Sequence, residues 1–175
     1  MPILITYATS YGSTGEIADR IASRLHVHGF AVHCRPVDHV FSVENYSAII
    51  LGSAMRGTKW LFDAQKFLDV EAMGLQMKPT WTFSVGMTPA VKGPKWATNK
   101  AVSRESLLME RTISRKMPKV RGHRLFIGKD AASRIPGPIR SLSTCVGGRS
   151  RDHRDWDEVD AWADAIATEL KLEGI

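Results

Sequence analysis

Short apolar runs alternate with amphipathic segments along the whole chain. The apolar runs are bounded by polar residues or glycine and predict strands at 3–8, 31–36, 47–53, 80–85 and 122–128. Segments with apolar residues three or four positions apart predict helices at 14–28, 61–73, about 99–116 and 156–172. Because strands and helices alternate, we expect right-handed crossovers that build a doubly wound, mostly parallel α/β sheet with helices on both faces.

The segment 156–172 has the clearest helical pattern. One stripe of apolar side chains runs along it: Val159, Trp162, Ala163, Ile166, Ala167 and Leu170. Asp155 and Glu158 have the spacing of a D-x-x-E helix start. We therefore expect this helix to pack on the sheet.

The stretch Ala8–Thr14 joins the first predicted strand to the first predicted helix. It gathers hydroxyl groups around a glycine, in the order Thr9, Ser10, Tyr11, Gly12, Ser13 and Thr14. The start of a helix presents unpaired N–H groups and the positive end of the helix dipole, and hydroxyl groups add donors that can surround a phosphate. A glycine lets the backbone approach the ligand closely. The stretch therefore predicts a phosphate-binding turn.

Two common phosphate motifs are absent from this turn. Neither G-x-G-x-x-G nor G-x-x-x-x-G-K-[ST] occurs there, which disfavours a dinucleotide site and a P-loop NTPase. The single phosphate of a flavin mononucleotide (FMN) fits better. The alternative is that Ser13 only caps the helix and Glu16 completes a capping box.

Two more predicted strands end in small and polar residues. The first ending contributes Ser53, Ala54, Met55, Arg56 and Gly57, and the second contributes Ser84, Val85, Gly86, Met87 and Thr88. In a doubly wound sheet, ligands bind beyond the carboxyl ends of the strands, where the strand order reverses. We therefore expect these two loops and the phosphate turn to meet in one crevice.

Length and composition narrow the class of protein. The chain has 175 residues, enough for one well-buried domain over 1–175 and too few for two of ordinary size. It contains no apolar stretch of eighteen residues, so we expect a cytoplasmic protein. Cys34 and Cys145 lie far apart and the six histidines are scattered, which predicts neither a disulfide nor a metal site.

Positive charge is concentrated in one part of the chain. The net charge is +6, but the segment 92–124 holds ten Lys or Arg and only two Glu, a balance of +8 that leaves about −2 for the rest. Such a segment suits binding to an anionic small molecule, an acidic protein, anionic lipid or nucleic acid. The alternative is that it is only a solvated helix face. No nucleic-acid recognition motif is present, which makes nucleic acid the least favoured partner.

The predicted helix over about 99–116 has two distinct faces. Apolar residues gather on one face at Val102, Met109, Ile113 and Met117, together with Ser106. Arginines gather on another at Arg104, Arg111 and Arg115. We expect the apolar face to cover the sheet. The alternative is peripheral docking on the inner face of the membrane.

Four motifs carry a resemblance to a known family. They are T-S-Y-G-S-T (9–14) followed by G-E-I-A, G-S-A-M-R-G (52–57), F-S-V-G (83–86) and R-D-W-D-E-V-D-A-W-A (154–163). With them the chain resembles the flavodoxin-like family, and within it the branch of menaquinone-dependent protoporphyrinogen IX dehydrogenases. The resemblance implies a five-stranded parallel sheet of order 2-1-3-4-5. It also implies that loop 9–14 binds the FMN phosphate, that loop 53–57 lies along the isoalloxazine ring, and that loop 84–88 reaches the pyrimidine edge.

This resemblance implies an FMN-dependent oxidoreductase of heme biosynthesis. A hydride would pass from an anionic reduced substrate to the flavin, and electrons would then pass to a quinone-type acceptor. Arginines suit the substrate's carboxylates. The candidates are Arg56 and the arginines of 92–124 and of the long irregular stretch 129–154. No acid–base pair stands out in the three loops, so the catalytic residues stay unassigned.

Two other functions fit the same loops. Flavodoxins that carry electrons are generally acidic and often stack an aromatic side chain on the flavin, whereas this chain is basic and has Met55 and Arg56 in the first flavin loop. Trp60 is the aromatic candidate to reach the ring. A basic flavodoxin-type electron carrier with an acidic partner is one alternative. A flavodoxin-like protein that binds a deazaflavin instead of FMN is the other.

Overall fold

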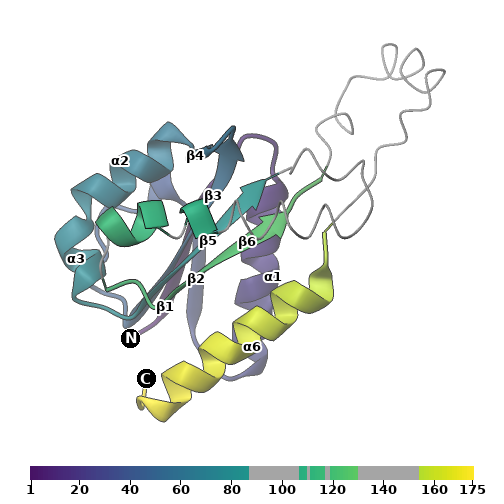
Figure 1. Cartoon of the computed structure of the whole chain (residues 1–175). Helices are drawn as coiled ribbons and strands as arrows, with labels where there is room; N and C mark the ends of the chain where they lie inside the picture. The colour runs from purple at the N-terminus through teal and green to yellow at the C-terminus, as the bar shows by residue number, and fades with distance from the viewer. Residues whose placement is uncertain (87–106, 110, 117–118, 130–153) are drawn as a thin grey trace.

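Five parallel strands form the central sheet in the order β2-β1-β3-β5-β6, as the computed structural model shows (Figure 1). The structure describes residues 1–86, 107–109, 111–116, 119–129 and 154–175. The strands are β1 (Ile3–Ala8), β2 (Val32–Pro36), β3 (Ala48–Arg56), β4 (Lys59–Trp60), β5 (Thr80–Gly86) and β6 (Gly122–Ile127). The helices are α1 (Ser13–Val27), α2 (Phe62–Val70), α3 (Ala72–Gln76) and α6 (Trp156–Leu172), with a 3-10 turn at Val37–His39. With β4 left aside, the strand order is the predicted 2-1-3-4-5.

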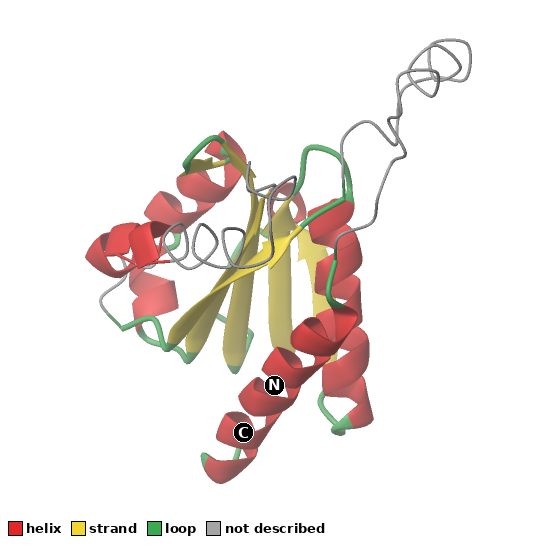
Figure 2. Ribbon diagram, turned by 45° about the vertical axis from the view of Figure 1, so that its right-hand side comes forward, coloured by secondary structure: helices red, strands yellow, loops and turns green. Residues whose placement is uncertain are grey.

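Helices cover both faces of the sheet (Figure 2). α1 and α6 pack on one face through side chains such as Ile17 and Ile166. α2, α3 and the helical residues 107–109 and 111–116 pack on the other, where Phe67 and Ile113 are buried. This is the predicted doubly wound arrangement, and burial of both faces explains why the inner strands β1 and β3 begin as nearly continuous apolar runs.

Aromatic rings fix α6 on the sheet. The ring centroids of Phe83, Phe126 and Trp162 lie 5.6 to 6.1 Å apart, with tilted or edge-on contacts. Phe83 is fully buried, and its ring lies over Gly52 of the neighbouring strand. The predicted apolar stripe of α6 is confirmed, because all six of its residues are buried. Asp155 caps this helix through a hydrogen bond from the Glu158 N–H.

Paired arginines and aspartates join α1 to α6. Arg20 donates two hydrogen bonds to Asp160, and Arg24 donates two to Asp164 at 2.6 and 2.8 Å. The partners are four residues apart on both helices, so the pairs repeat one turn along. The Arg24 guanidinium and then His28 hold the pKa of Asp164 down at about 2. These charged pairs therefore join the two helices.

Two local predictions need correction. The predicted helix 61–73 is broken at Glu71, because the chain turns there to bury Leu75 while Val70 and Met73 stay exposed. The predicted strand 47–53 extends to Arg56. Its last two residues form an antiparallel hairpin with the unpredicted strand β4.

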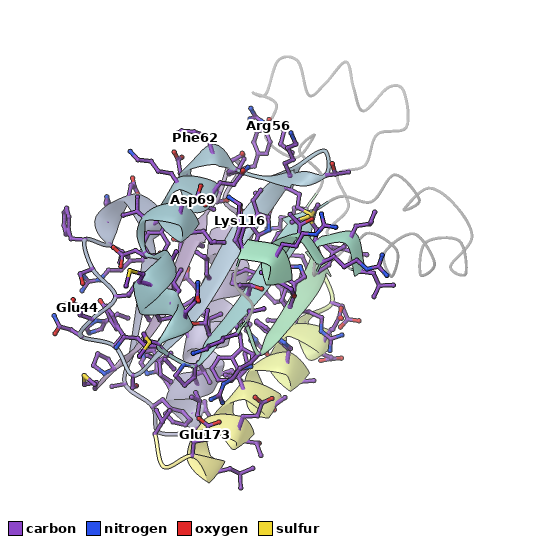
Figure 3. All side chains as sticks on the ribbon, turned by 60° about the vertical axis from the view of Figure 1, so that its left-hand side comes forward. Glu44, Arg56, Phe62, Asp69, Lys116 and Glu173 are labelled. Carbon is purple, nitrogen blue, oxygen red and sulfur yellow. The ribbon has the colours of Figure 1, made fainter. Side chains whose placement is uncertain are left out.

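The helical residues of 107–116 cover the sheet with part of their apolar face. Met109 and Ile113 are buried there, whereas Leu107 and Leu108 are about half exposed. Lys116 Nζ lies 2.7 Å from Asp69 Oδ1 of α2. Both residues are labelled in Figure 3. The rest of the predicted apolar face, at 102, 106 and 117, lies outside the described residues. Among the described helices, none is long and apolar enough to cross a membrane.

Candidate functional site

A cavity of about 300 Å³ opens at the edge of the sheet where the parallel strands end. It is lined by Thr9, Ser10, Tyr11, Ser13, Thr14, Ala54, Met55, Arg56, Gly57, Val85, Gly86, Gly128 and Lys129. These residues follow or end β1, β3, β5 and β6. Parallel strands in register bring their carboxyl ends together, as the pairing of Ala8 with Ser53 and of Ala54 with Val85 illustrates. The three predicted loops therefore meet, and a fourth strand end joins them.

Gly12 forms the turn into α1. Its φ of 87° lies in the left-handed region that favours glycine, and its N–H donates to the Thr9 hydroxyl at 2.9 Å. The first hydrogen bond of the helix runs from the Glu16 N–H to the Gly12 carbonyl at 3.0 Å. The backbone N–H groups before Glu16 thus belong to the first turn of α1, and they have no hydrogen-bond acceptor within the helix. The turn leaves the positive end of the helix at the cavity.

The Thr14 side chain carries an unused hydroxyl in this cavity. Thr14 is 1% exposed, and its Oγ1 has no hydrogen-bond partner in the described part of the chain. A buried hydroxyl without a partner costs free energy, and such groups are rare in proteins. Thr14 lines the cavity at the helix start. A ligand oxygen at this point would satisfy the hydroxyl.

The capping-box alternative is wrong. Gly12, not Ser13, holds the N-cap position of α1, and no side chain caps that helix. The Glu16 carboxylate instead accepts hydrogen bonds from Arg154 at 2.6 Å and from Lys129 at 3.0 Å. These two cations, Arg154 first, lower the pKa of Glu16. The hydroxyl groups of Ser13 and Thr14 are therefore not used as helix caps.

The β3–β4 hairpin forms one wall of the cavity. Its register pairs Met55 with Trp60, and Gly57 makes the turn with a φ of 64°. Gly86 faces this wall across the sheet edge, because a Cβ added to Gly86 would lie 3.3 Å from the Met55 sulfur. The exposed Arg56 lies at the end of this wall. It is at the same end of the molecule as the carboxyl ends of the parallel strands (Figure 3).

A buried chain of hydrogen bonds supports the loops from beneath. Trp60 Nε1 donates to Ser84 Oγ at 2.7 Å, and the His123 ring lies between Ser84 Oγ at 3.2 Å and Thr82 Oγ1 at 2.9 Å. A neutral His123 with its proton on Nδ1 satisfies all of these groups, since Ser84 then donates to Nε2 and His123 donates to Thr82. Burial lowers the pKa of His123 to about 4. The network therefore ties the β3–β4 hairpin to β5 and β6.

Most of the predicted loop residues line the cavity, but three described ones do not. Gly12 shapes the turn, whereas the fully buried side chains of Ser53 and Ser84 make hydrogen bonds within the protein. Ser53 Oγ accepts from the Leu61 N–H at 3.1 Å and donates to the Ala54 carbonyl at 2.8 Å. These two hydroxyls therefore position the loops. The predicted residues Met87 and Thr88 lie outside the described residues.

The aromatic prediction also needs correction. Trp60 is 5% exposed and belongs to the core on the α2 face, so it does not reach the cavity. Tyr11 is the aromatic residue among those that line the cavity, and it is 57% exposed. Its ring is therefore available to a ligand at the open side.

Gly128 and Lys129 are the lining residues that sequence reasoning missed. They directly follow β6, and the Gly128 N–H donates to the Gly86 carbonyl at 3.0 Å. The predicted strand 122–128 was parallel to the others, so its carboxyl end had to reach the same edge. That rule could have identified both residues, although they have no recognisable motif.

The candidate arginine clamps divide into two groups. Arg56 lines the cavity, whereas Arg111 and Arg115 are exposed and do not line it. Arg121 pairs with Glu173, Arg124 lies 3.6 Å from Glu158 and Arg154 binds Glu16. Several other arginines of 92–124 and 129–154 lie outside the described residues. In the part of the chain that the structure describes, no group of three His, Cys, Asp or Glu side chains could hold a metal ion.

Comparison with known proteins agrees with this architecture. A family model described as "Flavodoxin domain" matches residues 4–129. A flavodoxin from Archaea has a TM-score of 0.61 and 15% identity, over 98% of this chain and 99% of that one. Oxidised flavodoxin 2 from Bacillus cereus has a TM-score of 0.56 and 22% identity, over 97% and 99%. A flavodoxin from Streptococcus pneumoniae TIGR4 has a TM-score of 0.59 and 16% identity, over 97% and 99%. No curated protein sequence matches.

Proposed function

This chain belongs to the flavodoxin domain family, and from that premise we propose that it binds FMN in the edge cavity and transfers electrons to and from acidic partner proteins. One observation carries the proposal. The buried Thr14 hydroxyl has no partner in the described residues and lies at the helix start, where a phosphate would be bound.

The residues present fit this cofactor. The hydroxyls of Ser10, Ser13 and Thr14 and the first turn of α1 offer donors to a phosphate. Ala54, Met55, Val85 and Gly86 give this part of the cavity small and apolar lining that suits a flat ring system. Bound FMN supplies the electron chemistry, and the protein supplies binding and orientation.

The charge at the cavity decides the kind of partner. Arg56 lines the cavity and is exposed, and Lys59, its cross-strand partner in the β3–β4 hairpin, is exposed too. Complementary charges steer redox partners toward the cofactor and raise their association rate at low salt. We therefore infer that electron-transfer partners present acidic surfaces. Rates of electron exchange with an acidic protein should fall as salt rises.

Replacing Thr14 with valine should move cofactor affinity and stability in opposite directions. Valine keeps the volume but removes the hydroxyl, so the affinity for FMN should fall about tenfold, as one lost hydrogen bond to a charged group implies. The free energy of unfolding without FMN should rise by about 1 kcal/mol, because an unsatisfied buried group is gone. Flavin fluorescence titration and urea denaturation measure the two quantities.

Thr6→Val is the matched control. Thr6 is the other buried threonine whose hydroxyl has no partner among the described residues, and it does not line the cavity. The control should gain stability and keep the wild-type affinity for FMN. If Thr14→Val also keeps the wild-type affinity, the phosphate does not bind at this helix start.

An enzyme that acts on an anionic substrate is the second candidate. The exposed Arg56 at the cavity favours it, since a guanidinium can bind both oxygens of a carboxylate. The resemblance carried by the motifs at 52–57, 83–86 and 154–163 implies protoporphyrinogen as that substrate.

Two measurements separate the candidates. Purified protein is first titrated with FMN and with a deazaflavin, and its reduction potentials are determined. Oxidation of protoporphyrinogen is then followed with a menaquinone analogue as acceptor. A carrier binds FMN with two well-separated one-electron potentials and shows no turnover. Turnover would favour the enzyme. Binding of the deazaflavin but not of FMN would make a deazaflavin the cofactor of this protein. Failure to bind either ligand would reject both candidates.

A further inference from the structure

Lys129 lies where the cavity meets the start of α1. It follows β6 and lines the cavity beside Gly128. A Cβ added to Gly128 would lie 3.8 Å from Ser13 Oγ, so this strand end contacts the phosphate turn directly. The side chain of Lys129 is about one-third exposed. Lys129 is therefore a cationic residue beside the end of the cavity that holds the hydroxyls.

Glu16 and Arg154 hold this lysine in place. Lys129 Nζ lies 3.0 Å from Glu16 Oε2, and Arg154 binds the same oxygen at 2.6 Å. The Arg154 side chain is only 3% exposed, and its guanidinium stacks on the Trp156 ring at 4.3 Å. A buried, stacked arginine is a fixed anchor, so Glu16 is fixed too. The lysine thus has a defined position at the cavity.

We propose that Lys129 is a phosphate-binding residue that makes this cavity selective for a phosphorylated flavin over an unphosphorylated one. The inference rests on the proposed function. It adds a positively charged side chain to a phosphate-binding turn that otherwise offers only hydroxyl and N–H groups. Two independent features point to an anion here, namely the partnerless Thr14 hydroxyl and the ammonium of Lys129. A phosphomonoester carries about two negative charges at neutral pH, so a nearby cation stabilises it strongly.

The first test compares FMN with riboflavin. Lys129→Met should weaken FMN binding about tenfold in low salt and leave riboflavin binding unchanged, because the two ligands differ only in the phosphate. Lys129→Arg should keep most of the FMN affinity. Lys171→Met is the matched control: it removes the same charge from the last turn of α6, where the C-terminus lies at the end of the molecule opposite the cavity (Figure 1). This control should leave both affinities unchanged.

A double-mutant cycle with Glu16→Gln separates binding from charge neutralisation. If Lys129 only neutralises Glu16, removing the lysine should have no effect once the carboxylate is gone. If Lys129 binds the phosphate, Lys129→Met should still weaken FMN binding severalfold in the Glu16→Gln protein. Full loss of the effect in that background would overturn the proposal.

Inorganic phosphate provides a readout that does not depend on flavin. Millimolar phosphate should raise the Tm of the wild-type protein and of Lys171→Met, but not that of Lys129→Met. If phosphate stabilises the protein in this lysine-dependent way but FMN does not bind, the proposed function fails and the phosphate site remains. If FMN binds and Lys129→Met keeps the wild-type preference for FMN over riboflavin, the proposed function remains and the role of Lys129 is rejected.

Discussion

Gly52→Ala is expected to lower the free energy of unfolding by about 3 kcal/mol, the cost of an overpacked core. A Cβ at this position would lie 2.1 Å from Phe83 Cζ. Phe83 cannot move aside easily, because it is fully buried between Phe126 and Trp162. Urea denaturation should therefore show a lower midpoint with an unchanged m-value.

Two further variants test this explanation. Gly122→Ala adds the same methyl group on β6, where the new Cβ would lie 3.6 Å from Trp81, an ordinary contact. It should change the free energy of unfolding by less than about 1 kcal/mol, since alanine is no worse than glycine in a strand. Phe83→Leu should recover part of the loss in a double variant with Gly52→Ala. If the two losses simply add, the ring and the methyl group do not clash.

The same contact also bears on the cavity. Gly52 pairs with Phe83 across β3 and β5, and the next pair, Ser53 with Ser84, leads directly into the two loops. A wider spacing at the first pair separates the loops that would hold the flavin ring. Gly52→Ala is thus expected to weaken FMN binding as well, although Gly52 does not line the cavity.

The parallel sheet and the meeting of the loops could be predicted from short-range patterns and one topological rule, whereas the strand order 2-1-3-4-5 was implied by the resemblance to the flavodoxin-like family. Apolar runs identified each parallel strand, and right-handed crossovers left few possible orders. The glycine-containing turn at 9–14 identified the helix start without any tertiary information. All three loops then had to lie at one edge.

The direction of individual side chains was harder to predict. Ser84 was counted among the cavity loop residues, but the two-residue period of β5 places it with Thr82 on the face where Trp60 and His123 are bonded. Trp60 was expected at the flavin, but an unpredicted two-residue strand turns it into the core. The error at Trp60 came from ending β3 three residues too early, whereas Ser84 lay inside the predicted strand 80–85 and only its side-chain direction was misjudged.

The charged contacts around the helix start were not predictable from local pattern. Glu16 has the correct spacing for a capping box, yet its partners Lys129 and Arg154 are more than a hundred residues away in the chain. Such pairs depend on how α6 and β6 are placed against α1. Only the tertiary structure brings them together.

The wild-type protein is expected to lose about 3 kcal/mol of stability between pH 7 and pH 4 through His123 alone. Burial lowers the pKa of this residue to about 4 in the folded state, against about 6.5 in the unfolded chain. Between these two values the unfolded state binds a proton that the folded state does not. This contribution is therefore fully present above pH 6.5, and it is lost as the pH falls to 4. Urea denaturation at a series of pH values measures the slope.

His123→Gln should remove this slope while keeping a polar group between Thr82 and Ser84. The variant is expected to be less stable than the wild type at pH 7, because an amide cannot reproduce both ring contacts, and closer to it at pH 4.

Asp164→Asn is the control and should keep the wild-type slope between pH 7 and pH 4. The pKa of Asp164 is lowered to about 2, so its contribution to stability is lost only below pH 4. Because Ser84 and Trp60 share the network beneath the loops, the affinity for FMN should also decline as the pH falls through about 4, where His123 of the folded wild type is protonated, and not in His123→Gln. An equal slope in both proteins would show that His123 is protonated in the folded state and that the neutral network is wrong.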